Sequence, residues 1–96
     1  MTAESTPDVR NNLDLHRYEL YVGDRMIGIA DYHRRDDVVV LPHTVIEPRQ
    51  RGRGWGDVIV RAALDDLRQQ GVRIIPQCWF VAEFVDHNPQ YADLVA

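Results

Sequence analysis

The sequence predicts an α+β fold with a central, mostly antiparallel sheet, one main helix and a short C-terminal helix. Two observations favour this class. Strand-forming segments separated by short turns occupy the first half of the chain, and one long helical pattern dominates the second half. At 96 residues and 45% apolar composition, the chain has room for one small domain with a modest core.

Residues 1–12 are polar, contain Pro7 and lack periodicity. We expect them to form a flexible tail, with residues 13–96 as the single domain. Strand formers dominate from Leu15 to Val22, and a turn at Gly23-Asp24 leads into a second strand over Met26–Tyr32. These two segments predict a β-hairpin.

A second turn, at residues 34–37, precedes the apolar run Val38–Leu41. A continuous apolar run predicts a third strand that is buried on both faces. Pro42 cannot donate to a ladder and therefore predicts a bulge or kink in this strand, which continues to Ile46. A short strand over residues 73–76 is expected beside it, and a last helix from about Phe80 to His87.

The main helix is predicted from Trp55 to about Gln70. Five apolar residues recur at the spacing of one helix face: Ile59, Val60, Ala63, Leu64 and Leu67. Gly71 follows at the position where a left-handed residue closes a helix. No Ser, Thr or Asn stands at the usual N-cap position, so the first amides of this helix lack an obvious side-chain acceptor.

The segment Arg49–Gly56 contains three of the six glycines, at Gly52, Gly54 and Gly56. Glycine reaches positive φ values and lets a ligand approach the backbone closely, and a helix start adds free N–H groups and the positive end of its dipole. The segment therefore predicts a cradle for an anion such as a phosphate.

The spacing Arg49, Gly52, Gly54 resembles the signature of the GNAT superfamily of acetyl-CoA-dependent N-acyltransferases. Together with His43-Thr44, Pro76 with Cys78, and His87–Tyr91, it is similar to a short stand-alone branch called YjdJ-type. The resemblance covers residues 13–96 and implies a reduced GNAT-like fold. The first strand and the next two helices of the usual layout have no counterpart here, which implies an open groove for the acceptor.

The resemblance implies that acetyl-CoA is the cosubstrate and that an amine, on a small molecule or a protein, accepts the acetyl group. The loop amides of Gly52, Gly54 and Gly56 would hold the coenzyme A pyrophosphate, with Arg51 and Arg53 supplying positive charge and Arg49 pinning the loop. A splayed strand segment, Thr44, Val45 and Ile46, would pair with the pantetheine arm. Trp55 would lie along the coenzyme or pack on the sheet, and packing is favoured.

Catalytic groups are less evident from the sequence. Cys78, the single cysteine, is either a nucleophile that carries the acyl group or a buried core residue. His43 is either a general base or a structural strand histidine. The tyrosine that superfamily members use as a general acid is replaced by Phe84 or Val85 at its expected place. Tyr91 is the nearest substitute unless it only packs the C-terminal segment, and Glu47 is a further candidate base acting through water.

Other functional classes are disfavoured by composition. The formal net charge of −4 argues against nucleic acid and anionic membranes as partners. A single cysteine and four scattered histidines argue against a zinc site, and no metal is expected. The absence of a signal-like segment favours a cytoplasmic location. The alternative to an enzyme is a non-catalytic module that binds acetyl-CoA or another protein.

Overall fold

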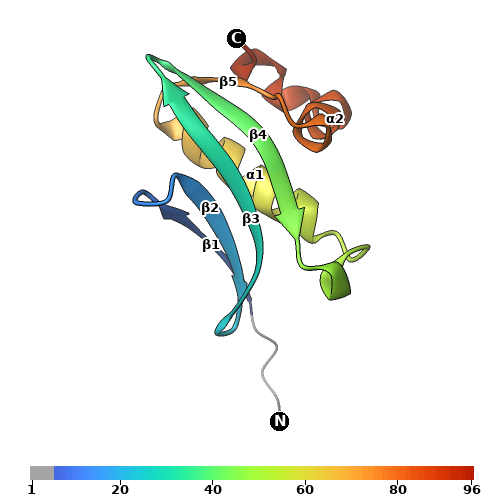
Figure 1. The fold of residues 1–96 in the computed structure, drawn as a ribbon. Helices are drawn as coiled ribbons and strands as arrows, with labels where there is room; N and C mark the ends of the chain where they lie inside the picture. Colours follow the sequence, from blue (N-terminus) through green and yellow to red (C-terminus); the bar gives the residue numbers. More distant parts are fainter. Residues whose placement is uncertain (1–5) are drawn as a thin grey trace.

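The computed structural model describes residues 6–96 as one sheet covered by helices (Figure 1). The strands are β1 Pro7–Asn12, β2 Arg17–Val22, β3 Arg25–Arg35, β4 Val38–Ile46 and β5 Arg73–Ile75. The helices are α1 Trp55–Gln69 and α2 Trp79–His87, with 3₁₀ turns η1 Pro48–Gln50 and η2 Pro89–Leu94. The predicted α+β class and mostly antiparallel sheet are confirmed.

The sheet order follows the sequence, β1-β2-β3-β4-β5. The first three pairings are antiparallel, whereas β4 and β5 run parallel because α1 carries the chain across the sheet between them. The predicted hairpin forms β2 and β3, with Gly23 at φ 63° in its turn. At the C-terminus, Ala96 N–H donates to the Ile74 carbonyl oxygen at 2.9 Å, which fixes the chain end beside β5.

Residues 7–12 form a strand, which corrects the expectation of a tail over this part of the chain. All six residues of β1 pair with β2, from Pro7 opposite Val22 to Asn12 opposite Arg17. A polar segment can serve as an edge strand, because its side chains stay partly in water while its backbone groups are paired. Residues 1–5 of the expected tail lie outside the described residues.

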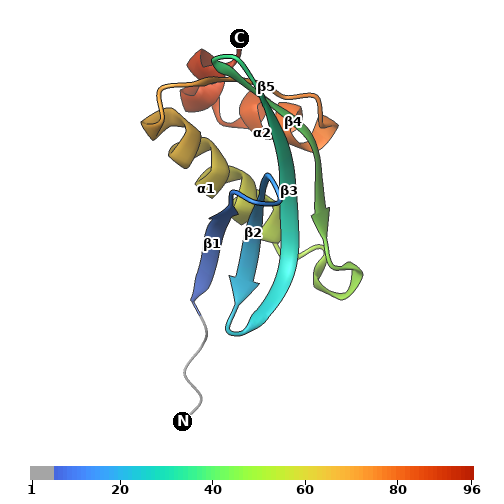
Figure 2. The same ribbon diagram turned by 60° about the vertical axis from the view of Figure 1, so that its left-hand side comes forward.

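Helix α1 lies across one face of the sheet, as Figure 2 shows. Its buried side chains are the five that the periodicity predicts: Ile59, Val60, Ala63, Leu64 and Leu67. Gly71 follows the helix at φ 73°, so the left-handed C-terminal stop is also confirmed. These side chains form one core cluster with residues of β2, β3, β4, α2 and η2.

The predicted irregularity at Pro42 is a β-bulge. His33 pairs with Val40, but the next pair is Asp31 with His43, so two steps along β3 match three steps along β4. The extra residue of β4 therefore lies in Leu41-Pro42, where proline removes one ladder donor. Among the described helices, none combines the length and apolarity needed to cross a membrane.

Candidate functional site

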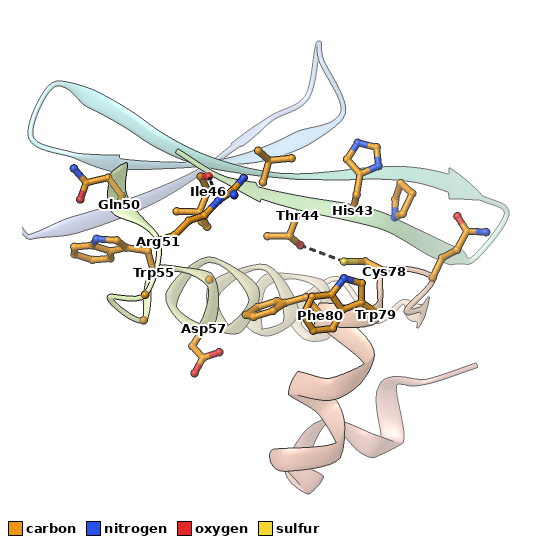
Figure 3. Close-up of a pocket in the computed structure, with 16 residues that line it drawn as sticks. His43, Thr44, Ile46, Gln50, Arg51, Trp55, Asp57, Cys78, Trp79 and Phe80 are labelled. Atoms are coloured by element: carbon orange, nitrogen blue, oxygen red, sulfur yellow. Dashed lines mark hydrogen bonds between the residues drawn. The ribbon is translucent and has the colours of Figure 1, made fainter. Parts of the chain in front are cut away.

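A cavity opens where β4 and β5 separate. Strand β5 pairs only with residues 38–40 of β4, and Cys78 N–H then donates to the Leu41 carbonyl oxygen at 2.8 Å before the chain turns into α2. From Pro42 to Ile46, the side of β4 that faces away from β3 has no partner strand among residues 6–96. The cavity beside this free edge has a volume of about 750 Å³ (Figure 3).

Ten of the twelve predicted site residues line this cavity: His43, Thr44, Val45, Ile46, Arg51, Gly52, Gly54, Trp55, Gly56 and Cys78. Six further residues complete its wall: Pro42, Gln50, Asp57, Gln77, Trp79 and Phe80. The two predicted residues outside the lining are Arg49 and Arg53. Residues about 35 positions apart in the sequence therefore meet around one space.

The segment of residues 52–56, called the glycine loop below, forms one end of the cavity. Gly52 and Gly54 have φ values of 78° and 85°, and a Cβ built on either would meet no heavy atom within 4 Å. Gly54 is the N-cap of α1, and no side chain in the described part of the chain caps the helix. The N–H groups of the first helical turn therefore have no acceptor within the helix, beside a loop open enough for a ligand. This geometry fits an anion such as a pyrophosphate.

Trp55 adds an unsatisfied donor to this end. Its ring packs partly against the core, which is the placement that the sequence analysis favoured, and it also lines the cavity. Its indole Nε1 is buried and has no hydrogen-bond partner within residues 6–96. A buried donor without an acceptor is costly, so Trp55 leaves one unsatisfied polar group beside this end of the cavity.

Arg51 lies between the loop and the end of β4. Its Nε donates to the Ile46 carbonyl oxygen at 3.2 Å, so Arg51 fastens the loop to the end of β4. Arg51 also lines the cavity, so part of its positive charge faces the cradle. Asp57 lines the cavity as well, where its carboxylate lies in the first turn of α1 and interacts favourably with the helix dipole.

Cys78 and Thr44 lie at the other end of the cavity. The Cys78 side chain is buried, and its Sγ lies 3.9 Å from Thr44 Oγ1. Trp79 follows immediately and is 72% exposed at the rim. Phe80 reaches back toward the loop end, where its ring would meet a Cβ on Gly56 at 2.6 Å. Gly56 is therefore required for the packing of α2 against α1.

The bulge at Pro42 places His43 on the opposite wall. Val39 and Leu41 belong to the core, and strict alternation would put His43 on the same face. The extra residue reverses the alternation, so that Thr44 pairs with core residue Ala30 while His43 faces away from α1. Figure 3 shows His43 and Thr44 on opposite sides of β4. His43 Nε2 lies 2.5 Å from Asp31 Oδ2.

Two further candidates for acid or base chemistry lie outside the cavity. Both Glu47 carboxylate oxygens accept from the Arg25 guanidinium. The Tyr91 hydroxyl donates to Asp65 Oδ1 at 2.6 Å, and its ring lies 5.7 Å from that of Phe84. Burial, and then the hydrogen bond to the Asp65 carboxylate, raise the pKa of Tyr91. These contacts support the structural interpretation of both residues.

For most of the cavity residues that were not predicted, the sequence contains a weak indication that they lie at the site. Trp79 and Phe80 directly follow Cys78, and an aromatic pair at a helix start beside a candidate site could have been included. Gln50 and Asp57 flank the glycine loop on either side. Asp31 has no sequence signal, because its proximity to His43 depends on the bulge.

A family model for GCN5-related N-acetyl-transferase matches residues 17–94, which is most of the chain and includes both ends of the cavity. The chain belongs to the GCN5-related N-acetyltransferase family. Protein NATD1 from Bos taurus is 33% identical to it over 66 residues, and protein NATD1 from Homo sapiens is 30% identical over 66 residues. Each match covers 69% of this chain and 58% of the relative.

Solved structures show the same fold. The solution structure of a GCN5-like protein from Staphylococcus aureus matches with a TM-score of 0.70 at 16% identity, over 93% of this chain and 87% of that one. The ribosomal-protein-S18-alanine N-acetyltransferase from Escherichia coli matches with a TM-score of 0.59 at 20% identity, over 67% of this chain and 43% of that one. These structures share the fold, and the family model that matches residues 17–94 confirms the resemblance to the GNAT superfamily.

Proposed function

We propose that this chain is an N-acetyltransferase that moves an acetyl group from acetyl-CoA to a primary amine. The observation that carries the proposal is the continuity of one cavity, which joins an anion cradle, an unpaired strand edge and a group of reactive side chains. A ligand with a phosphate group, a chain of amides and a reactive end, in that order, fits this arrangement. Acetyl-CoA has these three parts, and family membership supports it as the cosubstrate.

Different residues of the cavity would bind different parts of the cosubstrate. The backbone amides of Gly52, Gly54 and the first turn of α1 would hold the pyrophosphate, with the Arg51 guanidinium beside them. The free edge of β4, from Thr44 to Ile46, would exchange backbone hydrogen bonds with the amides of the pantetheine arm, as an added strand does.

When bound, the cosubstrate supplies an acetyl thioester that an amine can attack. His43 would take the proton from the amine nitrogen, since an imidazole acts as a base near neutral pH and His43 lines the reactive end of the cavity. Backbone donors near Val45 would stabilise the negative charge that develops on the carbonyl oxygen. The new nitrogen–carbon bond replaces the carbon–sulfur bond. The coenzyme A sulfur leaves as a thiolate that takes up a proton from solvent, and the His43 imidazolium returns its proton to solvent.

The proposed acceptor is an amine on a small molecule, a peptide or a protein. His43 faces away from α1, so the amine would enter from the sheet face that α1 does not cover. The chain spans 58% of the length of the NATD1 protein that it matches. A screen of amines from each of the three classes would identify the acceptor.

A second candidate is a module that binds acetyl-CoA without transfer. The observation that favours it is the position of Tyr91, which is held by Asp65 outside the cavity. No tyrosine lines the cavity within residues 6–96, so the general acid of the usual mechanism has no tyrosine equivalent there. A covalent variant uses Cys78, whose Sγ lies in the wall, as a transient acetyl carrier.

Calorimetric titration with acetyl-CoA tests the cradle. Gly54→Ala is compared with Gly71→Ala, because both glycines have positive φ and open surroundings, at opposite ends of α1. Each change should cost about 1 kcal/mol of folding stability. Gly54→Ala should weaken binding by about tenfold or more, because its Cβ enters the cradle, whereas Gly71→Ala should bind like the wild type. Equal affinities in both variants would refute the proposed cradle.

A measurement of turnover distinguishes the transferase from the module that only binds acetyl-CoA. Release of free coenzyme A thiol that depends on an added amine supports the enzyme, whereas binding without release supports the module. Intact-protein mass spectrometry after acetyl-CoA is added tests the covalent variant. One added acetyl group in the wild type that is absent from Cys78→Ser would support an acyl-cysteine, and full turnover by Cys78→Ser would exclude it.

A further inference from the structure

Asp31 and His43 form a cross-strand pair on the sheet face that α1 does not cover. They stand directly opposite each other in the β3–β4 ladder, and His43 Nε2 lies 2.5 Å from Asp31 Oδ2. The side chains are 30% exposed for Asp31 and 59% exposed for His43. His43 lines the cavity, whereas Asp31 does not. The carboxylate can therefore act on a ligand only through the imidazole.

The nearest cation on the neighbouring strand is engaged by a different carboxylate and not by Asp31. Arg17 is the partner of Asp31 on the neighbouring strand β2, but its Nε donates to Glu19 Oε2 at 2.8 Å. Glu19 also accepts from Asn12 and Tyr21, so this second carboxylate is engaged by its own donors. Within residues 6–96, the Asp31 carboxylate contacts the His43 imidazole.

The short distance favours one position for the ring proton. Two lone pairs at this separation would repel each other, so the contact favours the tautomer with hydrogen on Nε2, the nitrogen beside the carboxylate. In the neutral imidazole, Nδ1 is then the nitrogen with a free lone pair. An imidazole without such a partner distributes its proton between the two nitrogens and can rotate. The Asp31 carboxylate thus favours one tautomer of His43.

We propose that Asp31 is a positioning residue that keeps His43 Nδ1 available as the proton acceptor for the incoming amine. The inference rests on the proposed transferase function. The proton moves from the amine nitrogen to Nδ1 as the nitrogen–carbon bond forms, and the Asp31 carboxylate offsets the positive charge that develops on the imidazolium. The bulge at Pro42 is the structural cause of the pairing, because without the extra residue Asp31 would face Pro42.

The tautomer is measurable without any turnover. In protein with labelled imidazole nitrogens, the NMR shifts of the wild type should show His43 protonated on Nε2 in its neutral form. Asp31→Ala should show a mixed tautomer. Asp37→Ala is the matched control, because it removes an equal charge from an exposed position in the turn of the same hairpin. Its tautomer should match that of the wild type.

Steady-state kinetics supply the second readout. Asp31→Ala should lower kcat by about tenfold to a hundredfold with little change in KM for acetyl-CoA, because Asp31 lies outside the cavity lining. Asp31→Asn, which keeps the shape of the side chain, should fold like the wild type and should also lose kcat, because an amide cannot offset the imidazolium charge. Asp37→Ala should retain wild-type kcat.

The outcomes are distinguishable. An unchanged tautomer or an unchanged kcat in Asp31→Ala, with turnover in the wild type, would overturn the positioning role and leave the transferase function intact. Where Asp31→Ala does not fold, Asp31→Asn decides the same question through its kcat. A wild type that shows the Nε2 tautomer but transfers acetyl to no amine would refute the proposed function and reduce the pair to a structural contact.

Discussion

At the scale of single residues, two neighbouring aspartates of α1 each accept a hydrogen bond from a buried tyrosine. Tyr18 on β2 donates to Asp66 Oδ2 at 2.7 Å, and Tyr91 on η2 donates to Asp65 Oδ1 at 2.6 Å. Helix α1 is thereby tied to the sheet through one aspartate and to the C-terminal segment through the other. Burial, followed by the hydrogen bond to the adjacent carboxylate, raises the pKa of both phenols.

These tyrosines make stability depend on alkaline pH. A folded-state pKa above the unfolded value of about 10 stabilises the fold fully below pH 10, and this contribution is lost as pH rises through the folded-state pKa. Tyr91→Phe should lower the free energy of unfolding by about 1 kcal/mol near pH 7, with a smaller difference from the wild type above pH 10. Urea unfolding at several pH values measures both effects.

The same variant tests the role assigned to Tyr91 in the site. Because its hydroxyl is held by Asp65 outside the cavity, Tyr91→Phe should keep wild-type kcat. A large loss of kcat in a folded Tyr91→Phe would return this residue to the catalytic candidates.

At the scale of elements, the contact between α1 and α2 shapes the cavity. The tip of the Phe80 ring lies where a side chain on Gly56 would be, with the nearest ring atoms at 2.6 and 3.0 Å from a Cβ placed there. Both residues line the cavity, so the width of the space between the glycine loop and Cys78 depends on this contact. A larger residue at position 56 must displace either the ring or the helix.

Gly56→Ala should therefore destabilise the fold by about 1–3 kcal/mol and weaken acetyl-CoA binding, because overpacking forces Phe80 out of place. Phe80→Leu in the same chain should restore part of both losses. A double-mutant cycle measured by urea unfolding and by titration gives the coupling energy. Additive effects of the two substitutions would contradict this account of the contact.

At the scale of the whole molecule, β1 extends the sheet to five strands and covers the outer edge of β2. Its end is fixed by side chains as well as by the ladder, since Asn12 Nδ2 donates to Glu19 Oε2 at 3.0 Å. Val9 packs partly against the core. The strand lies at the sheet edge opposite β5, so its contribution is to the stability of the sheet and not to the wall of the cavity.

Deletion of residues 1–12 should lower the free energy of unfolding by about 2 kcal/mol or more, which corresponds to a fall in Tm on the order of 10 °C. Deletion of residues 1–5 is the matched control, and the difference between the two variants isolates the strand. Thermal unfolding measures it. Equal Tm values for the two deletions would mean that β1 contributes nothing to folding.

Much of the fold was predictable because it depends on local patterns. The buried face of α1, the stop at Gly71 and the turn at Gly23 follow from helical periodicity and from the conformational freedom of glycine. Strand β1 was missed because edge pairing needs backbone groups and few apolar side chains, so its polar sequence carries little signal.

The candidate site was predictable in part. Local sequence was enough to predict the glycine loop, because positive φ angles at Gly52 and Gly54 are a local property, and to predict an irregularity at Pro42. The anchoring of the loop by Arg51 and the contact of His43 with Asp31 across the sheet depend on the tertiary structure. The physical reason is that a one-residue bulge reverses the face of every following side chain, and its place in the ladder is set by pairing between strands.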